Sequence, residues 1–100
     1  MTEKFTPYDT AEYLKTDEDM AAYLDAVLEE DDPKLIISAL GTIARAKGMS
    51  QIARNTGLAR ESLYRALSAN GNPEFSTVLK VIHAVGISLH AQPSSLPKAV

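Results

Sequence analysis

Cysteine is absent from this chain of 100 residues, which excludes disulfide bonds and thiolate metal sites. The only histidines, His83 and His90, do not have the spacing of paired metal ligands, and structural roles suit both of them better. Glycine-rich phosphate-binding loops are missing as well. We therefore expect neither a metal nor a cofactor, and the lack of cysteine suits the reducing cytoplasm.

Long apolar runs and catalytic motifs are also lacking. No run of apolar residues approaches the length of a membrane span, and the first residues lack the apolar centre of a signal peptide. Ser62 lies next to Glu61 and near Arg65, but nothing supplies a base at a spacing that would activate it as a nucleophile. We expect a cytoplasmic protein that is not an enzyme and does not bind a membrane.

Positive charge is scarce in the first third of the chain. Residues 1–32 contain eleven acids and two lysines, a net charge of −9, whereas residues 33–100 contain eight basic residues and two acids, a net charge of +6. The basic part is suited to phosphate contact, and DNA would repel the acidic part. The alternative for the acidic part is a solvated helix that only keeps the protein soluble.

The most informative stretch runs from Gly48 to Leu67 and predicts two short helices joined by a tight turn. Ala53 is small enough for two helix backbones to approach closely, and Gly57 can adopt the left-handed conformation that ends a helix. Leu58 would fill the corner, and Leu63 would form an apolar stripe with Leu67 on the second helix. These spacings are typical of a helix-turn-helix.

The outward face of the second helix has side chains suited to base edges and phosphates, namely Arg60, Glu61, Ser62, Tyr64 and Arg65. Tyr64 has two interpretations: it packs against the preceding helix, or it points at a phosphate or a thymine methyl group. The whole stretch has an alternative interpretation too, as an ordinary helical hairpin with a solvated charged face.

The remaining patterns predict an all-α fold, a compact domain of five to six helices that contains this helix-turn-helix and ends in a short β-strand. Helices are expected at 9–15, from Thr16 to about 28, from Pro33 to about Lys47, and from Asn72-Pro73 to Val85. Leu35, Ile36 and Phe75 are among the expected core residues. Ile87–Ala91 alternates like a strand, whose backbone would pair with a second copy of the chain. The expected parts are an acidic helical segment (1–32), a DNA-binding domain (33–91) and a disordered tail (92–100).

Five motifs together resemble one known family: AEYL at 11–14, DEDMAAYL at 17–24, DPKLIISALGTIARAKGMSQIA at 32–53, TGLARESLYRALSANGNPEF at 56–75 and TVLKVIHAVG at 77–86. The chain is similar to the addiction-module antidote proteins, small HigA-like antitoxins with a helix-turn-helix of the phage-repressor class. The resemblance implies a type II toxin–antitoxin system, in which the antitoxin silences a small basic ribonuclease toxin of the RelE/ParE-like superfamily. It also implies a homodimer that binds its own operator, double-stranded DNA, and represses the operon.

By position, the resemblance places Arg60, Glu61, Ser62, Tyr64 and Arg65 on the recognition helix and Arg54 on the helix before it. The sequence departs from phage-type repressors at Ala59, where they usually have Ser, Thr or Asn as the helix cap. The acidic segment from Asp9 to Asp32 would help to hold the basic toxin. The candidate toxin-binding residues are Asp17, Glu18, Asp19, Tyr23 and Asp25.

Two other functions fit the same sequence. A stand-alone helix-turn-helix repressor would bind an operator but have no toxin partner, and its acidic helices would serve dimerisation or packing only. A pure protein-interaction module would have a motif that no longer binds DNA, and the missing cap at Ala59 favours it.

Overall fold

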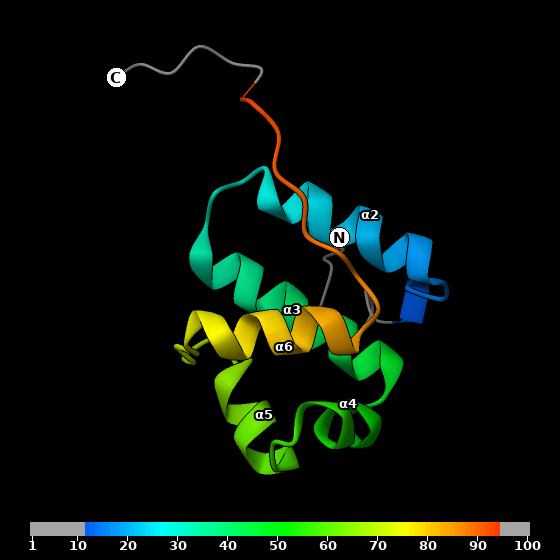
Figure 1. The fold of residues 1–100 in the computed structure, drawn as a ribbon, viewed down its shortest axis with the longest axis vertical. Coiled ribbons are helices and arrows are strands. Elements are labelled where there is room, and N and C mark those ends of the chain that lie inside the picture. The colour runs from blue at the N-terminus through cyan, green and yellow to red at the C-terminus, as the bar shows by residue number, and fades with distance from the viewer. Residues whose placement is uncertain (1–11, 95–100) are drawn as a thin grey trace, which may run out of the picture.

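Five α-helices make up most of residues 12–94, the part of the chain described by the structure, a computed structural model (Figure 1). In order they are α2 (Asp17–Leu28), α3 (Pro33–Lys47), α4 (Met49–Thr56), α5 (Arg60–Ala66) and α6 (Phe75–Ala84). The prediction of an all-helical fold is confirmed. Residues 9–11 of the predicted helix at 9–15 lie outside the described residues. Of residues 12–15 only Glu12 and Tyr13 are helical, and a sixth helix is not supported. The predicted tail lies outside them from residue 95 onward.

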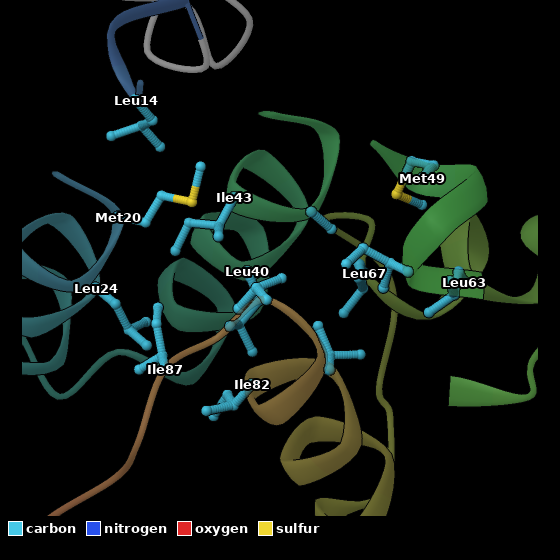
Figure 2. Packing of buried hydrophobic residues seen from close by; sticks show 14 of the residues in the cluster. Leu14, Met20, Leu24, Leu40, Ile43, Met49, Leu63, Leu67, Ile82 and Ile87 are labelled. Atoms are coloured by element: carbon cyan, nitrogen blue, oxygen red, sulfur yellow. The ribbon is translucent and has the colours of Figure 1, made fainter. Parts of the chain in front are cut away.

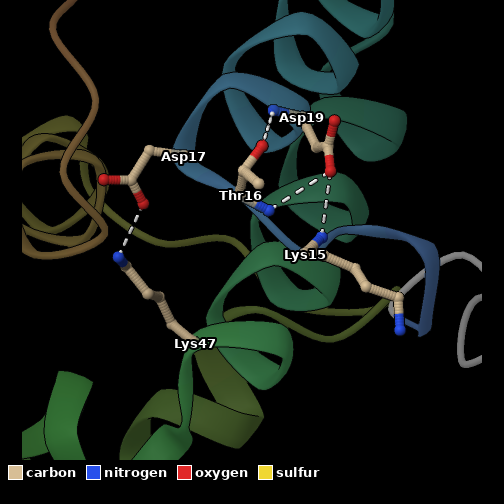
Figure 3. Close-up of polar contacts among 5 residues, drawn as sticks. All are labelled: Lys15, Thr16, Asp17, Asp19 and Lys47. Atoms are coloured by element: carbon tan, nitrogen blue, oxygen red, sulfur yellow. Dashed lines mark hydrogen bonds and ion pairs between the residues drawn. The ribbon is translucent and has the colours of Figure 1, made fainter.

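Local hydrogen bonds at the helix starts explain why these segments are helical. The Thr16 hydroxyl accepts a hydrogen bond from the Asp19 N–H at 3.0 Å, and the Asp19 carboxylate accepts one from the Thr16 N–H at 3.2 Å, a reciprocal capping box (Figure 3). At the start of α3, the Asp32 carboxylate accepts from the Lys34 N–H at 3.1 Å, and Pro33 occupies the first helical position. The predicted bounds of α3 are therefore confirmed at both ends.

Helix α3 forms the centre of the molecule, because it packs against α2, α4 and α6. Its Leu40 and Ile43 are fully buried, and the core around them joins residues from every described helix (Figure 2). The buried members of this cluster are Leu14, Met20, Leu24, Leu40, Ile43, Ala44, Met49, Ile52, Ala53, Leu63, Leu67, Val81, Ile82, Val85 and Ile87. Since residues before and after position 32 share this core, α2 does not fold apart from α3. The division of the chain into functional parts at residue 32 remains a prediction.

Two predicted core residues are on the surface. Phe75 is 67% exposed and Leu35 is 41% exposed. Helix α6 begins at Phe75 with Glu74 as its N-cap, so the predicted start at Asn72-Pro73 is wrong. Phe75 continues the apolar stripe of Val78 and Ile82, but other helices cover that stripe only from Val78 onward. Leu35 lies likewise in the first turn of α3, where the periodicity is right but no helix covers the face.

The predicted β-strand at Ile87–Ala91 is wrong, since the described residues contain no strand. A lone extended segment has no second strand among residues 12–94 to complete a ladder. Instead, the Ile87 N–H donates to the Ile82 carbonyl at 3.1 Å, and the Ile87 side chain is buried in the core. The segment then leaves α6 and runs past α2 (Figure 1).

Candidate functional site

The turn between α4 and α5 has the geometry that its sequence predicts. Gly57 adopts φ 77° and ψ 11°, in the left-handed region, and its N–H donates to the Ala53 carbonyl at 2.9 Å. The Thr56 hydroxyl donates back to the Ile52 carbonyl at 2.8 Å and accepts from the Leu58 N–H at 3.3 Å. These bonds hold both sides of the turn and set the direction in which α5 leaves it.

The inward face of α5 is defined by leucines. Leu63 has no exposed surface, Leu67 is also buried, and Leu58 packs against the core cluster from the turn. With Leu63 inside, the helical period turns the other side chains outward. Arg60, Glu61, Ser62, Tyr64 and Arg65 are all exposed, as is Arg54 on α4. All six residues predicted to contact DNA are therefore exposed on the α4–α5 unit (residues 49–66).

The cations of this surface are available to a partner. Within the part of the chain that the structure describes, Arg54, Arg60 and Arg65 form no ion pair with a carboxylate. The Arg60 guanidinium lies over the Tyr64 ring, 5.7 Å from its centroid, in a cation–π contact that leaves both side chains exposed. Tyr64 also lines a small cavity with Gly41, Arg45, Met49 and Leu67, so one part of its ring faces neighbouring helices.

The loop after α5 adds polar groups to this surface that the sequence analysis did not include. Ser68, Asn70 and Asn72 line a cavity of about 370 Å³ together with Ser62 and Arg65 of α5. Gly71 holds the loop there, because a Cβ at this position would overlap the Ala66 carbonyl, and its N–H donates to Ser68 at 2.9 Å. The run of short polar residues directly after α5 is the signal that could have predicted this extension of the surface.

The first position of α5 lacks a side-chain cap. Ala59 is its N-cap, with φ −69° and ψ 145°, and no side chain accepts a hydrogen bond from the first turn. We expect Ala59→Ser to raise the free energy of unfolding by about 1 kcal/mol, because the backbone already has the extended conformation that a capping serine needs. Urea titration of the variant measures this. Ala26→Ser, at an exposed position in the last turn of α2, is the matched control and should be neutral or slightly destabilising. Equal gains for the two would disprove the capping explanation.

The predicted toxin-binding residues on α2 differ in their surroundings. Asp17 forms an ion pair with Lys47 of α3 at 2.8 Å, and Asp19 belongs to the capping box (Figure 3). Tyr23 is half-buried against the core. Glu18 and Asp25 are exposed and have no partner among the described residues. Three of the five candidates therefore have contacts within the fold, and two are fully available.

The acidic and basic parts of the sequence are also separated in space. Helix α2 lies at one end of the long axis and the α4–α5 unit at the other, with α3 and α6 between them (Figure 1). One partner can therefore contact α2 while another contacts α5. None of the helices in residues 12–94 is long and apolar enough to cross a membrane.

Comparison with known proteins gives a consistent result. A family model described as "Probable addiction module antidote protein" matches residues 4–93. A protein of Haemophilus influenzae, described only as an uncharacterized protein, is 51% identical over 94 residues, which cover 94% of this chain and 97% of that protein. No solved structure matches the chain.

Proposed function

Since the chain belongs to the family of probable addiction module antidote proteins, we propose that it is an antitoxin with two binding surfaces. One surface neutralises a RelE/ParE-like ribonuclease toxin by direct binding. The other binds operator DNA and represses the operon of the chain itself. The observation that supports the second surface best is the row of exposed side chains on α5, whose arginines have no carboxylate partner in the described residues.

For DNA binding, α5 acts as the recognition helix of a helix-turn-helix and enters the major groove. Arg60 and Arg65 donate hydrogen bonds in a fixed fork that matches the acceptors of guanine or a phosphate. Ser62 and Tyr64 lie between them in the sequence and are exposed as well, and Arg54 contacts the DNA backbone from α4. Contacts to base edges give sequence specificity, and contacts to phosphates give affinity. Because arginine can make both kinds of contact, this surface can supply both properties.

For toxin binding, α2 and the turn after it present a surface that has only negative charges. Residues 17–32 include eight acids and no basic residue. Such a surface attracts a small basic protein over a distance of about a Debye length and orients it before contact. Glu18 and Asp25 are the first candidates for direct contact, because neither is used within the described fold.

We propose further that the chain binds DNA as a homodimer. Each α5 would occupy one half-site of a near-palindrome, and the half-sites would lie about one helical turn, or a multiple of it, apart.

A stand-alone repressor is the second candidate. It is favoured by the contacts of Asp17 and Asp19, which show that part of the acidic segment serves folding. It predicts operator binding without a toxin partner. The uncapped start of α5 favours the third candidate, an interaction module that does not bind DNA.

A gel shift of the upstream DNA of the gene, with and without the purified product of the adjacent reading frame, tests the proposal. An antitoxin shifts the DNA, binds the neighbouring product and restores growth to cells that express it. A shift without any interaction identifies the stand-alone repressor. An interaction without a shift identifies the protein-interaction module.

Salt provides an independent test of phosphate contact. We expect the affinity for the operator to fall steeply between about 50 and 200 mM salt, because each phosphate contacted by an arginine releases a counterion. Fluorescence anisotropy over this range measures the slope. An affinity that does not change with salt would exclude binding driven by phosphate contacts.

A further inference from the structure

A groove runs between α2 and the extended segment that follows α6; we call it the α2 groove. Its volume is about 520 Å³. One wall is α2, through Ala21, Ala22, Asp25 and Leu28, and the other is the segment 87–92. The two small alanines leave room for another polypeptide to approach the helix closely.

The second wall offers unpaired backbone. The Ile87 N–H is bonded to Ile82, but between positions 88 and 92 no backbone group forms a hydrogen bond to any residue that the structure describes. These residues are exposed and follow one another without helix or turn. An extended segment of this kind is a template for pairing with another chain, as at the edge of a sheet.

The charge beside the groove identifies the kind of chain that fits. Asp25 lines the groove, and Glu18 and Glu29 lie seven residues before it and four after it on the exposed side of α2. Helix α2 contains no lysine or arginine, so the carboxylate of Asp25 has no basic neighbour on its own helix. An incoming chain with lysine or arginine side chains would therefore be attracted to this side of the groove.

We propose that the α2 groove accepts an extended, basic segment of the toxin, which adds as a strand along residues 88–92. This inference rests on the proposed function and specifies its toxin-binding surface. Backbone hydrogen bonds to the segment provide affinity, small or apolar side chains of the toxin lie over Ala21 and Ala22, and its basic side chains meet Asp25. Because side chains alternate along a strand, one incoming segment can satisfy the apolar and acidic requirements together.

A second copy of this chain fits the same groove less well. In a twofold-symmetric dimer the same patch meets itself. Pairing along 88–92 would then bring two α2 helices, each with exposed carboxylates, toward one another without a basic residue between them. The carboxylates of α2 would instead attract the basic side chains of a basic partner.

Charge reversal at one position tests the electrostatic part. In the full-length chain, Asp25→Lys should weaken binding of the adjacent gene product by about tenfold or more, because it sets like charges against each other inside the groove. Glu74→Lys makes the same change in net charge at an exposed residue outside both the groove and the acidic segment and is the matched control. We expect less than about a threefold effect from it.

Proline pairs test the backbone part. Successive residues of an extended chain direct their N–H groups to opposite sides, so only alternate positions can donate to an added strand. One variant has Ser88→Pro with His90→Pro, and the other has Leu89→Pro with Ala91→Pro. Proline fits extended backbone but has no N–H. One pair should therefore weaken binding by about tenfold while the other has little effect, and thermal melting verifies that both variants are folded.

A second ligand separates this inference from the proposed function. A synthetic peptide of alternating valine and arginine is titrated into the chain and its variants, in parallel with the product of the adjacent gene. One outcome is that the neighbouring product binds with an affinity that is unchanged by Asp25→Lys and by both proline pairs. In that case the groove assignment is overturned and the antitoxin function stands. If only the peptide binds, with the same dependence on Asp25 and on one proline pair, the groove stands and the toxin assignment fails. Three results would overturn the inference. The first is that neither the neighbouring product nor the peptide binds, and the second is that all variants, the control included, change the affinity equally. The third is that a proline pair dissociates a homodimer of this chain.

Discussion

Replacing Arg60 and Arg65 together by alanine is expected to weaken operator binding by about 2–6 kcal/mol, which is a loss of roughly 30-fold to more than 1000-fold. Each arginine is exposed and has no carboxylate partner in the described residues, and Arg65 lies on the face of α5 opposite the buried Leu63. Each is expected to contribute about 1–3 kcal/mol if it contacts a base or a phosphate. Anisotropy titration with labelled operator measures the loss.

The control for this prediction is Lys80→Ala. Lys80 is an exposed cation on α6 that lines a separate cavity with Asn55 and His83, so its removal changes the net charge without changing the face of α5. Because all three side chains are exposed, none of the substitutions should lower the free energy of unfolding by more than about 0.5 kcal/mol. Equal losses of affinity for Lys80→Ala and Arg60→Ala would show that the interaction depends on net charge and not on α5.

Truncation of Leu63 is expected to have the largest effect on stability. Leu63 has no exposed surface and belongs to the core cluster, where it holds α5 against the body of the protein (Figure 2). Leu63→Ala removes buried methyl groups and leaves a cavity, which costs about 2–5 kcal/mol. Since small domains are stable by only about 5–15 kcal/mol in total, this cost is a large fraction of the free energy of unfolding.

Leu35→Ala is the matched control, because it makes the same chemical change at a leucine that is 41% exposed. We expect it to cost only about 1 kcal/mol, since less buried surface is lost than at Leu63 and solvent fills the space instead of a closed cavity. Urea titration of both variants measures the difference. A cost for Leu35→Ala as large as that for Leu63→Ala would contradict the burial pattern of α3 and α5.

The sequence predicted well those structural features that depend on interactions within one helical turn. Asp32 and Pro33 start α3, and Gly57 ends α4, because the hydrogen bonds that stop or start these helices join residues at most four positions apart. The outward face of α5 was predicted for a similar reason, since a buried Leu63 determines through the helical period which neighbours face solvent. The DNA-binding role of that face remains a prediction.

Only the tertiary structure decided features that depend on distant residues. The sequence by itself determined where most helices begin and end and which way α5 faces, because local hydrogen bonds and periodicity are sufficient for both. It could not show that Phe75 lies beyond the covered part of its helix, that Asp17 pairs with Lys47 thirty positions later, or that 87–91 forms no strand. Each of these depends on which elements happen to lie nearby after folding, and the same dependence places the extended segment beside α2 and so forms the α2 groove.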